Sequence, residues 1–488
     1  MSNQSVKKNF IMNAILTVTT MLFPLITFPY ASRILLPEGV GKVSFATSLI
    51  TYFSMFAQLG IPTYGIRICA QVRDDKEKLT RTAQELLIIN MVMNVFSYLV
   101  FFLCLLFVPR LREERILYIV VGVTIFLTSL GMEWLYKALE QYTYITIRSI
   151  IFKFVALIAM LAMVHNENDY VLYGGITILA ASASNILNFF NAHKYIQIKP
   201  IGNYNFKRHF KAIAVFFAMT CATTIYTHLD AVMLGFMKTD IDVGYYDASV
   251  KIKGVLVGIV ASLGAVLLPR ASYYIENKQF NEFKRITQKA IMFVFFLGTP
   301  LMIYFVLFAK EGILFLSGEA YMGSVIPMQI IMPTLLLIGL TNILGIQMLV
   351  PLGQEKYVLY SEISGAVVDI IINLILIPQY AATGAAIGTL IAELVVFIVQ
   401  FWALKDQIIE TFLGIKYYKI VFSCLLASFF ALAIRLFNFS NIALLFISAS
   451  IFGIVYVNVL LLCKDDMALE IYGIIKRIID NNIKYTRR

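Results

Sequence analysis

The sequence contains little charge, and this scarcity excludes most soluble folds. Only 14% of its 488 residues are charged, whereas 60% are hydrophobic. Soluble domains carry about 25% charged residues. The longest hydrophilic stretches, 67–81, 194–211 and 464–488, are each too short to fold as a separate domain. The chain is therefore expected to be an all-α integral membrane protein.

Features of catalytic and nucleotide-binding sites are also scarce. The four histidines lack the spacing of metal ligands, and the five cysteines are scattered without a CxxC pair. No Walker A sequence or other glycine-rich phosphate loop occurs. The acidic pairs at 74–75 and 465–466 lie among lysines and arginines, as in solvated loops. We therefore expect no enzyme, no cofactor, no metal site and no nucleic-acid partner.

Long apolar runs are abundant instead. A helix needs about 20 apolar residues to cross the hydrocarbon core of a bilayer. On that basis the sequence predicts about fourteen transmembrane helices, near 10–35, 43–66, 83–108, 116–136, 144–164, 171–192, 212–236, 246–268, 289–309, 325–350, 358–378, 384–403, 418–437 and 441–463.

Lysine and arginine are distributed unevenly among the predicted loops. The loops 67–82, 193–211 and 269–289 are rich in both residues, whereas 165–170 contains neither. Because cytoplasmic loops carry the excess of these cations, we expect both termini in the cytoplasm. The segment PRLREER at 109–115 is the exception, since it is cationic on the predicted outer side.

Two weakly similar pairs of segments indicate an internal repeat. Val40-Gly41-Lys42 aligns with Val243-Gly244-Tyr245, 203 residues later, and 138–144 aligns with 351–357, 213 residues later. Each half would hold an even number of spans, which makes the repeat parallel. The expected organisation is a six-helix lobe at 1–200, a second six-helix lobe at 201–405, two further helices within 406–463 and a cytoplasmic amphipathic tail at 464–488.

The tail has the pattern of an interfacial helix. One helical face would carry apolar residues only, namely Leu469, Ile471, Ile474, Ile475 and Ile478. Lys476 and Arg477 lie off this face, so the helix could rest on anionic membrane lipids. A solvated tail is the alternative.

Charged residues inside predicted spans mark candidate sites, because a charge at the bilayer centre costs at least about 2.5–3.5 kcal/mol. Four cations stand out: Arg33, Arg148, Lys153 and Lys251. Arg33 closes a span with two internal prolines, which is tolerated only beside protein or a wet cavity. The alternatives are interfacial anchoring for Arg148 and an ion pair with Asp247, one turn earlier, for Lys251.

Three acids also lie inside predicted spans: Asp230, Asp369 and Glu393. Such groups could bind a coupling proton or cation. A buried acid paired with one of the intramembrane lysines is an equally good interpretation.

The hairpin 23–71 is the predicted centre of the site. Its counterpart, 203 residues later, has Asp230 in place of Thr27 and Lys251 in place of Ser48. We expect the two hairpins to form facing walls of one polar cavity, with unequal charges.

Three stretches carry a family resemblance. They are FPLITFPYASRILLPEGVGKVSFATSLITYF (23–53), LEQYTYITIRSIIFKF (139–154) and GYYDASVKI (244–252). With them the chain resembles the bacterial polysaccharide flippases, the O-antigen and capsule repeat-unit transporters of the multidrug/oligosaccharidyl-lipid/polysaccharide superfamily. The resemblance covers nearly the whole chain.

This resemblance implies a flippase of the bacterial plasma (inner) membrane. It would move undecaprenyl-diphosphate-linked oligosaccharide repeat units for surface polysaccharide biosynthesis, by alternating access of a central cationic cavity. Related flippases of the peptidoglycan precursor meet the diphosphate with arginines, which implies that role for Arg33 and Lys251. As further cations inside predicted spans, Lys153 and Arg148 are expected to join them. The first span lacks a mid-span cation, which argues against peptidoglycan precursor as cargo. A polysaccharide polymerase and glycosyltransferases would be partners.

Rival functions stay open at this point. A drug/cation antiporter of the same superfamily should have an acidic cavity, whereas cations here are at least as prominent as acids. A membrane glycosyltransferase would need clustered His/Asp chemistry, which the sequence lacks. A non-transporting scaffold for glycan assembly is the third alternative.

Overall fold

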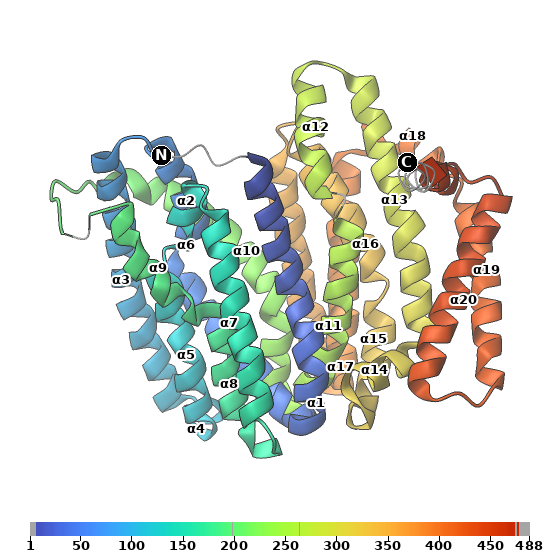
Figure 1. The fold of residues 1–488 in the computed structure, drawn as a ribbon, viewed down its shortest axis with the longest axis horizontal. Helices are drawn as coiled ribbons and strands as arrows, with labels where there is room; N and C mark the ends of the chain where they lie inside the picture. The colour runs from blue at the N-terminus through green and yellow to red at the C-terminus, as the bar shows by residue number, and fades with distance from the viewer. Residues whose placement is uncertain (1–5, 198, 263, 474–475, 478–488) are drawn as a thin grey trace, which may run out of the picture. The chain divides into compact units, whose positions relative to one another are not determined.

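The computed structural model describes residues 6–197, 199–262, 264–473 and 476–477, and every regular element in these ranges is a helix (Figure 1). The chain divides into two compact units. The first comprises Met1–Asp247 with Asn373–Ala385, and the second comprises Ala248–Ile372 with Ala386–Arg488. The predicted tail positions Ile474, Ile475 and Ile478 lie outside the described residues.

The first unit is built from the N-terminal half of the chain. Its helices are α1 (Val6–Gln58), α2 (Ile61–Gln71), α3 (Lys76–Phe107), α4 (Pro109–Glu113), α5 (Arg115–Leu130), α6 (Glu133–Ala138), α7 (Tyr142–Met163), η1 (Glu167–Asp169), α8 (Tyr170–Ile178), the π-helix η2 (Leu179–Ala183), α9 (Asn185–Asn191), η3 (Ala192–Lys194), α10 (Lys207–Met237) and the start of α11 (Asp240–Ala261).

The second unit contains most of the C-terminal half. Its helices are the rest of α11, α12 (Gly264–Glu276), α13 (Phe280–Leu307), α14 (Ala309–Ser317), η4 (Glu319–Ser324), α15 (Val325–Ile331), α16 (Thr334–Thr341), the π-helix η5 (Asn342–Leu349), most of α17 (Glu355–Ala403), α18 (Lys405–Leu413), α19 (Tyr417–Ala433), η6 (Ile434–Leu436) and α20 (Asn441–Leu462).

Many of these helices suit a membrane. Among the described residues, ten are long and apolar enough to cross one, or up to eleven if the bent pair Glu319–Ile331 and Thr334–Leu349 forms one span. The protein is thus an all-helical, multi-pass membrane protein. The count of fourteen and the cytoplasmic termini stay predictions.

Two helices are far longer than a bilayer is thick, and each contains a break. At about 1.5 Å per residue, the 53 residues of α1 would extend about 80 Å, against a hydrocarbon core of about 30 Å. Leu36 interrupts α1 with a φ of 57°, directly before Pro37, whose ring excludes a regular helix there. Ala381 interrupts α17 with a positive φ as well, of 47°. The Leu36 break falls in the predicted hairpin turn.

Helix α3 has the inside-out polarity of a membrane helix. On one face of the helix, Asn90, Asn94 and Ser97 are buried polar residues. The apolar side chains of Val95 and Phe107 are 73% and 78% exposed. In lipid, apolar side chains face outward and polar groups hold helices together. The Asn90 side-chain amide accordingly donates to the carbonyl oxygen of Ala57 on α1, at 3.1 Å.

The segments 138–144 and 351–357, which the predicted repeat aligns, each contain a turn that ends a helix. Glu140 and Gly353 both adopt a positive φ, of 57° and 69°. The following backbone N–H groups, of Gln141 and Gln354, donate to carbonyl oxygens five residues earlier, at 2.9 and 2.8 Å. This pattern closes a helix by satisfying its last carbonyl groups. A 213-residue offset thus relates two identical helix ends.

The basic linker before α10 is held against α3. The fully buried Glu85 carboxylate accepts hydrogen bonds from the backbone N–H of Asn205, from Arg208 and from His209. The other ring nitrogen of His209 lies 2.8 Å from the Tyr64 hydroxyl on α2. Because a buried charge needs such a complete set of partners, this cluster fixes the N-terminus of α10 to the first unit.

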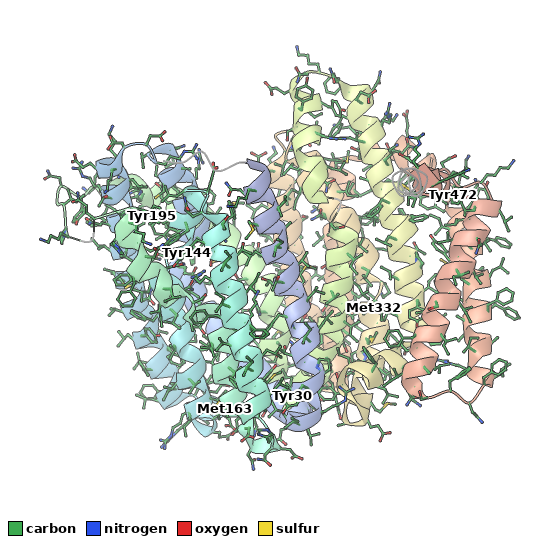
Figure 2. All side chains as sticks on the ribbon, in the orientation of Figure 1. Tyr30, Tyr144, Met163, Tyr195, Met332 and Tyr472 are labelled. Atoms are coloured by element: carbon green, nitrogen blue, oxygen red, sulfur yellow. The ribbon has the colours of Figure 1, made fainter. Side chains whose placement is uncertain are left out.

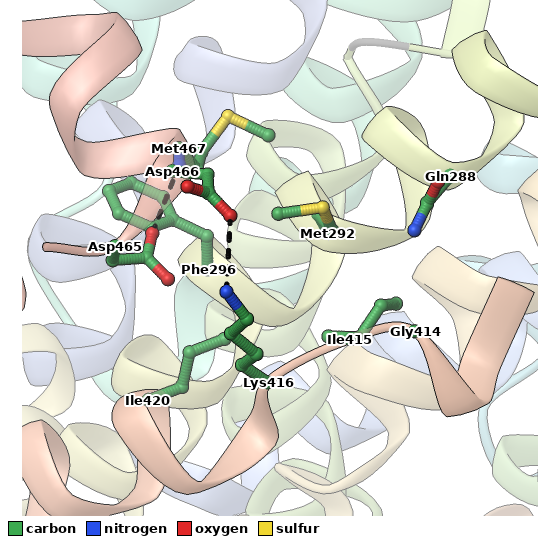
Figure 3. Close-up of a pocket in the computed structure, with 10 residues that line it drawn as sticks. All are labelled: Gln288, Met292, Phe296, Gly414, Ile415, Lys416, Ile420, Asp465, Asp466 and Met467. Atoms are coloured by element: carbon green, nitrogen blue, oxygen red, sulfur yellow. Dashed lines mark hydrogen bonds and ion pairs between the residues drawn. The ribbon is translucent and has the colours of Figure 1, made fainter.

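The end of α20 is tied to the start of α19. The Lys419 ammonium group donates to the carbonyl oxygen of Lys464 at 2.7 Å. Asp465 accepts the backbone N–H groups of Met467 and Ala468, each at 3.1 Å, and so caps the helical turn that follows. Figure 3 shows Asp465 and Met467 beside Lys416, whose ammonium nitrogen lies 3.9 Å from a carboxylate oxygen of Asp466. The small pocket between these residues is lined by side chains of the second unit alone.

Candidate functional site

Lys153 is a buried cation with few partners. Its side chain, on α7, is 8% exposed, and its ammonium group donates to the Thr20 hydroxyl on α1 at 2.6 Å. Within the described residues, that is its one hydrogen bond, and no carboxylate lies within ion-pair distance. An ammonium group has three donors, so Lys153 retains the capacity to bind an anion.

The position of Lys153 follows from the packing of α1 on α7. Thr146 donates to the carbonyl oxygen of Met12 at 2.9 Å, and Tyr30 donates to that of Val164 at 2.9 Å. Residue numbers rise together along both helices, so α7 runs parallel to the first part of α1. Between these two contacts, the same register brings Lys153 to Thr20. Figure 2 labels Tyr30 near the lower end of this pair.

Arg148 lies one helical turn and a half before Lys153 and is occupied by protein groups. One terminal nitrogen donates to the carbonyl oxygen of Ser184 at 2.8 Å and to the Asn185 side-chain oxygen at 3.0 Å. The other contacts the Glu133 carboxylate at 3.3 Å. Ser184 directly follows the π-helix η2, where the wider turn leaves backbone carbonyl groups in need of donors. Arg148 therefore stabilises an irregular helix end.

Arg33 is exposed on α1, three residues before the Leu36 break. Its guanidinium group donates to the carbonyl oxygen of Pro29, one turn earlier, at 2.6 Å. Pro29 and Pro37 each remove a backbone N–H donor from the helix. The cation thus lies beside the least regular part of α1.

Asp230 is held by two neutral donors. Its carboxylate, which is 4% exposed on α10, accepts a hydrogen bond from the Tyr246 hydroxyl and one from the Asn373 amide at 2.6 Å. All three residues belong to the first unit. A buried carboxylate inside a membrane helix is a group that could bind a coupling cation or proton.

The remaining predicted residues belong to the second unit. Asp369 and Glu393 are buried on α17, at 1% and 5% exposure, and Lys251 is half-buried on α11. The seven predicted residues are thus divided between the units, four in the first and three in the second. Within the described residues, no group of three or more His, Cys, Asp or Glu side chains could hold a metal ion.

In the cationic segment 109–115, exceptional in the sequence, Arg110 and Glu114 form ion pairs with other helices. Arg110 pairs with Asp240, and its Nε donates to the carbonyl oxygen of Gly235 at 3.2 Å. Glu114 pairs with Lys42 at 3.0 Å. Burial raises the pKa of the Asp240 carboxyl group, and the neighbouring Arg110 charge opposes that rise. These pairs link the segment to the ends of other helices, and Arg112 and Arg115 are exposed.

Sequence reasoning missed Thr20, Glu133 and Tyr246 as partners of the candidate residues. A signal for Thr20 was present, because Thr17 and Thr20 recur 203 residues later as Thr220 and Thr223. For Glu133 no such signal exists, since its contact with Arg148 depends on the irregular helix beside it.

Comparisons with known proteins complete this description. The family model described as "Polysaccharide biosynthesis protein" matches residues 6–275, and the MatE model matches residues 216–375. A "Putative O-antigen transporter" of Escherichia coli K12 is 24% identical over 396 residues, covering 80% of this chain and 95% of the relative. A protein of the same description from Shigella dysenteriae is 24% identical over 405 residues, covering 82% and 100%.

Among solved structures, the chain is similar to "Lipid II flippase MurJ, inward closed conformation". The TM-score is 0.76 at 15% identity, and the match covers 94% of this chain and 99% of that one. At this identity the likeness shows a shared fold alone.

Proposed function

The chain belongs to the polysaccharide biosynthesis protein family, and from that premise we propose that it flips a lipid-linked oligosaccharide across the bacterial plasma membrane. The family is one of transporters, not of enzymes. The cargo we propose is an undecaprenyl-diphosphate-linked repeat unit for surface polysaccharide. The relatives named as O-antigen transporters, matched over most of their length, support this cargo class.

The observation that carries the proposal is the buried Lys153 ammonium group. A diphosphate cannot cross hydrocarbon unaided, and it needs cations at membrane depth. Lys153 provides such a cation with Thr20 as its hydrogen-bonding partner among the described residues. Arg33 and Lys251 are the further diphosphate contacts we propose. Arg148 would join them only by exchanging its Glu133 contact for phosphate, because its guanidinium group is already bound.

Transport by this protein would use alternating access, in which the diphosphate-binding cations face first one side of the membrane and then the other. Asp230, Asp369 and Glu393 are the proposed sites of a coupling proton or cation. The donors around Asp230 support its part in this set. Glycosyltransferases would supply the substrate, and a polysaccharide polymerase would consume it.

A drug/cation antiporter is the second candidate function. The MatE match at residues 216–375 favours it, and so does the buried carboxylate of Asp230 within that range. The two candidates differ in the charge that binds the cargo: a cation such as Lys153 suits a diphosphate, whereas an acid suits a cationic drug.

Deletion and complementation test the proposal. In a deletion strain we expect lipid-linked oligosaccharide to accumulate on the cytoplasmic side and surface polysaccharide to disappear. The wild-type chain should reverse both effects, Lys153→Met should not, and Lys310→Met should, because Lys310 is an exposed lysine on α14 and is not one of the candidate residues. Normal polysaccharide in the deletion strain, together with greater drug sensitivity, would favour the antiporter.

A further inference from the structure

An apolar groove lies on the first unit, and none of the candidate charges is among the residues that line it. It has a volume of about 560 Å³ and is formed by α5, α7 and α8. Val120 forms one wall, Ala159 and Met163 a second, and Val171 to Leu179 a third. Met163, at the end of α7, is labelled in Figure 2. The groove exists because Ala159 and Gly175 have little or no side chain where larger residues would fill it.

One end of the groove is polar. Asn168 and Asp169 border it, in the loop that the distribution of lysine and arginine predicts to be outside. Asp169 is fixed, since its carboxylate accepts the backbone N–H groups of His165 and Asn166 at 2.8 and 2.9 Å. Asp169 thus gives this end of the groove a negative charge, and no lysine or arginine is among the residues that line the groove.

The length of the groove fits one leaflet. Along α8 it extends from Val171 to Leu179, which is about 12 Å at 1.5 Å per residue. The hydrocarbon core is about 30 Å thick, so each leaflet contributes about 15 Å. A partner transmembrane helix would need a groove that continues across both leaflets. An acyl chain of one lipid needs a groove of one leaflet's depth, with its headgroup at the polar end.

The charge of the rim restricts the headgroup. The Asp169 carboxylate disfavours an anionic headgroup and favours one that carries an ammonium group. A primary ammonium also has three N–H donors for Asp169 and Asn168. We infer that this groove binds a phospholipid with a primary-amine headgroup, with one acyl chain between α5, α7 and α8. The inference is independent of the cargo proposed above.

Native mass spectrometry of the purified full-length chain tests this inference. Vesicles of phosphatidylethanolamine or of phosphatidylglycerol supply the lipid, and bound lipid is counted after detergent extraction. We expect one retained phosphatidylethanolamine and about tenfold less phosphatidylglycerol. Equal retention of the two lipids would mean ordinary boundary lipid and would overturn the inference, as would a co-purified polypeptide that displaces the lipid.

Variants assign the retained lipid to the groove. Gly175→Leu should fill it and reduce retention about tenfold, because a Cβ at Gly175 meets only Val120, at an ordinary distance of 3.4 Å. Gly453→Leu is the matched control, since Gly453 on α20 faces open space. Asp169→Asn should keep the acceptor for His165 and Asn166 but lose the preference for phosphatidylethanolamine.

If Gly175→Leu does not reach the membrane, Ala159→Leu fills the groove from the opposite wall. Unchanged retention in a folded groove-filling variant overturns the inference. Unchanged preference in Asp169→Asn overturns the assignment of the headgroup.

Discussion

Gly41 and Gly244 pack reciprocally against each other's segments, although 203 residues separate them. A Cβ atom on Gly41 would overlap the carbonyl oxygen of Asp240, and one on Gly244 would overlap that of Pro37. Asp240 precedes Gly244 by four residues, as Pro37 precedes Gly41. The contact is therefore self-complementary, as at a two-fold interface, and both glycines lie in the first unit.

Gly41→Ala should destabilise the protein because the opposing group is backbone and cannot rotate away. Overpacking of this kind costs about 1–3 kcal/mol. A lower apparent Tm in detergent is the expected result, with Gly453→Ala as the control in open space. An unchanged Tm for Gly41→Ala would show that the two segments are not in close contact.

Thr20→Val should impair transport more than Thr19→Val. Both hydroxyl groups donate to a carbonyl oxygen one turn earlier in α1, that of Ile15 for Thr19 and that of Leu16 for Thr20. Of the two, Thr20 alone also accepts a hydrogen bond from the Lys153 ammonium group. A hydrogen bond to a charged group contributes about 1.5–3 kcal/mol, so a ten- to hundredfold loss of rate is the upper range expected. The measurement is surface polysaccharide formed per copy of membrane-inserted protein. An equal loss of transport in both variants would show that the hydrogen bond from Lys153 to Thr20 does not contribute to transport.

Asp230→Asn should uncouple transport from an ion gradient while leaving the protein folded. The amide retains an acceptor for Tyr246 but carries no charge for a proton or cation. Transport by vesicles with and without imposed Na⁺ or pH gradients measures the effect. If Asp230→Asn responds to both gradients as the wild type does, Asp230 is a structural acid.

Glu85→Gln should lower stability much more than Glu77→Gln on the same helix. Glu85 is fully buried and accepts hydrogen bonds through both oxygens. Glutamine keeps one acceptor oxygen but turns an NH2 donor toward other donors and removes the charge, which costs about 1–3 kcal/mol. Glu77 pairs with Arg81 at 2.8 Å on the surface, and such pairs contribute at most about 1 kcal/mol. Comparing the two apparent Tm values tests this. Similar Tm values would mean that the hydrogen bonds around Glu85 do not fix the N-terminus of α10.

The helices and the break in α1 were predictable because they depend on local properties. Apolar runs select the spans, and the Pro37 ring excludes a continuous helix at Leu36 whatever surrounds it. The sequence aligned the segments 138–144 and 351–357, and the structure adds that both contain a helix-ending turn, at Glu140 and Gly353.

Side-chain partners were not predictable, because they depend on register between distant helices. Arg110 and Asp240 lie 130 residues apart, and nothing in either segment specifies the other. The π-helix before Ser184 adds one residue to a turn without changing the apolar pattern, so the need for Arg148 there is invisible in the sequence. The division of the candidate charges between two units is a property of packing for the same reason.

The central claim is that Lys153 binds the diphosphate of a lipid-linked oligosaccharide during its transfer across the membrane. Proteoliposomes loaded with this lipid on the inner face test it most directly, with a membrane-impermeant lectin reporting glycan at the outer face. We predict lectin binding with the wild-type protein, a loss of about tenfold or more with Lys153→Met, and wild-type binding with Lys310→Met. Lectin binding that is equal for Lys153→Met and the wild type would contradict the claim.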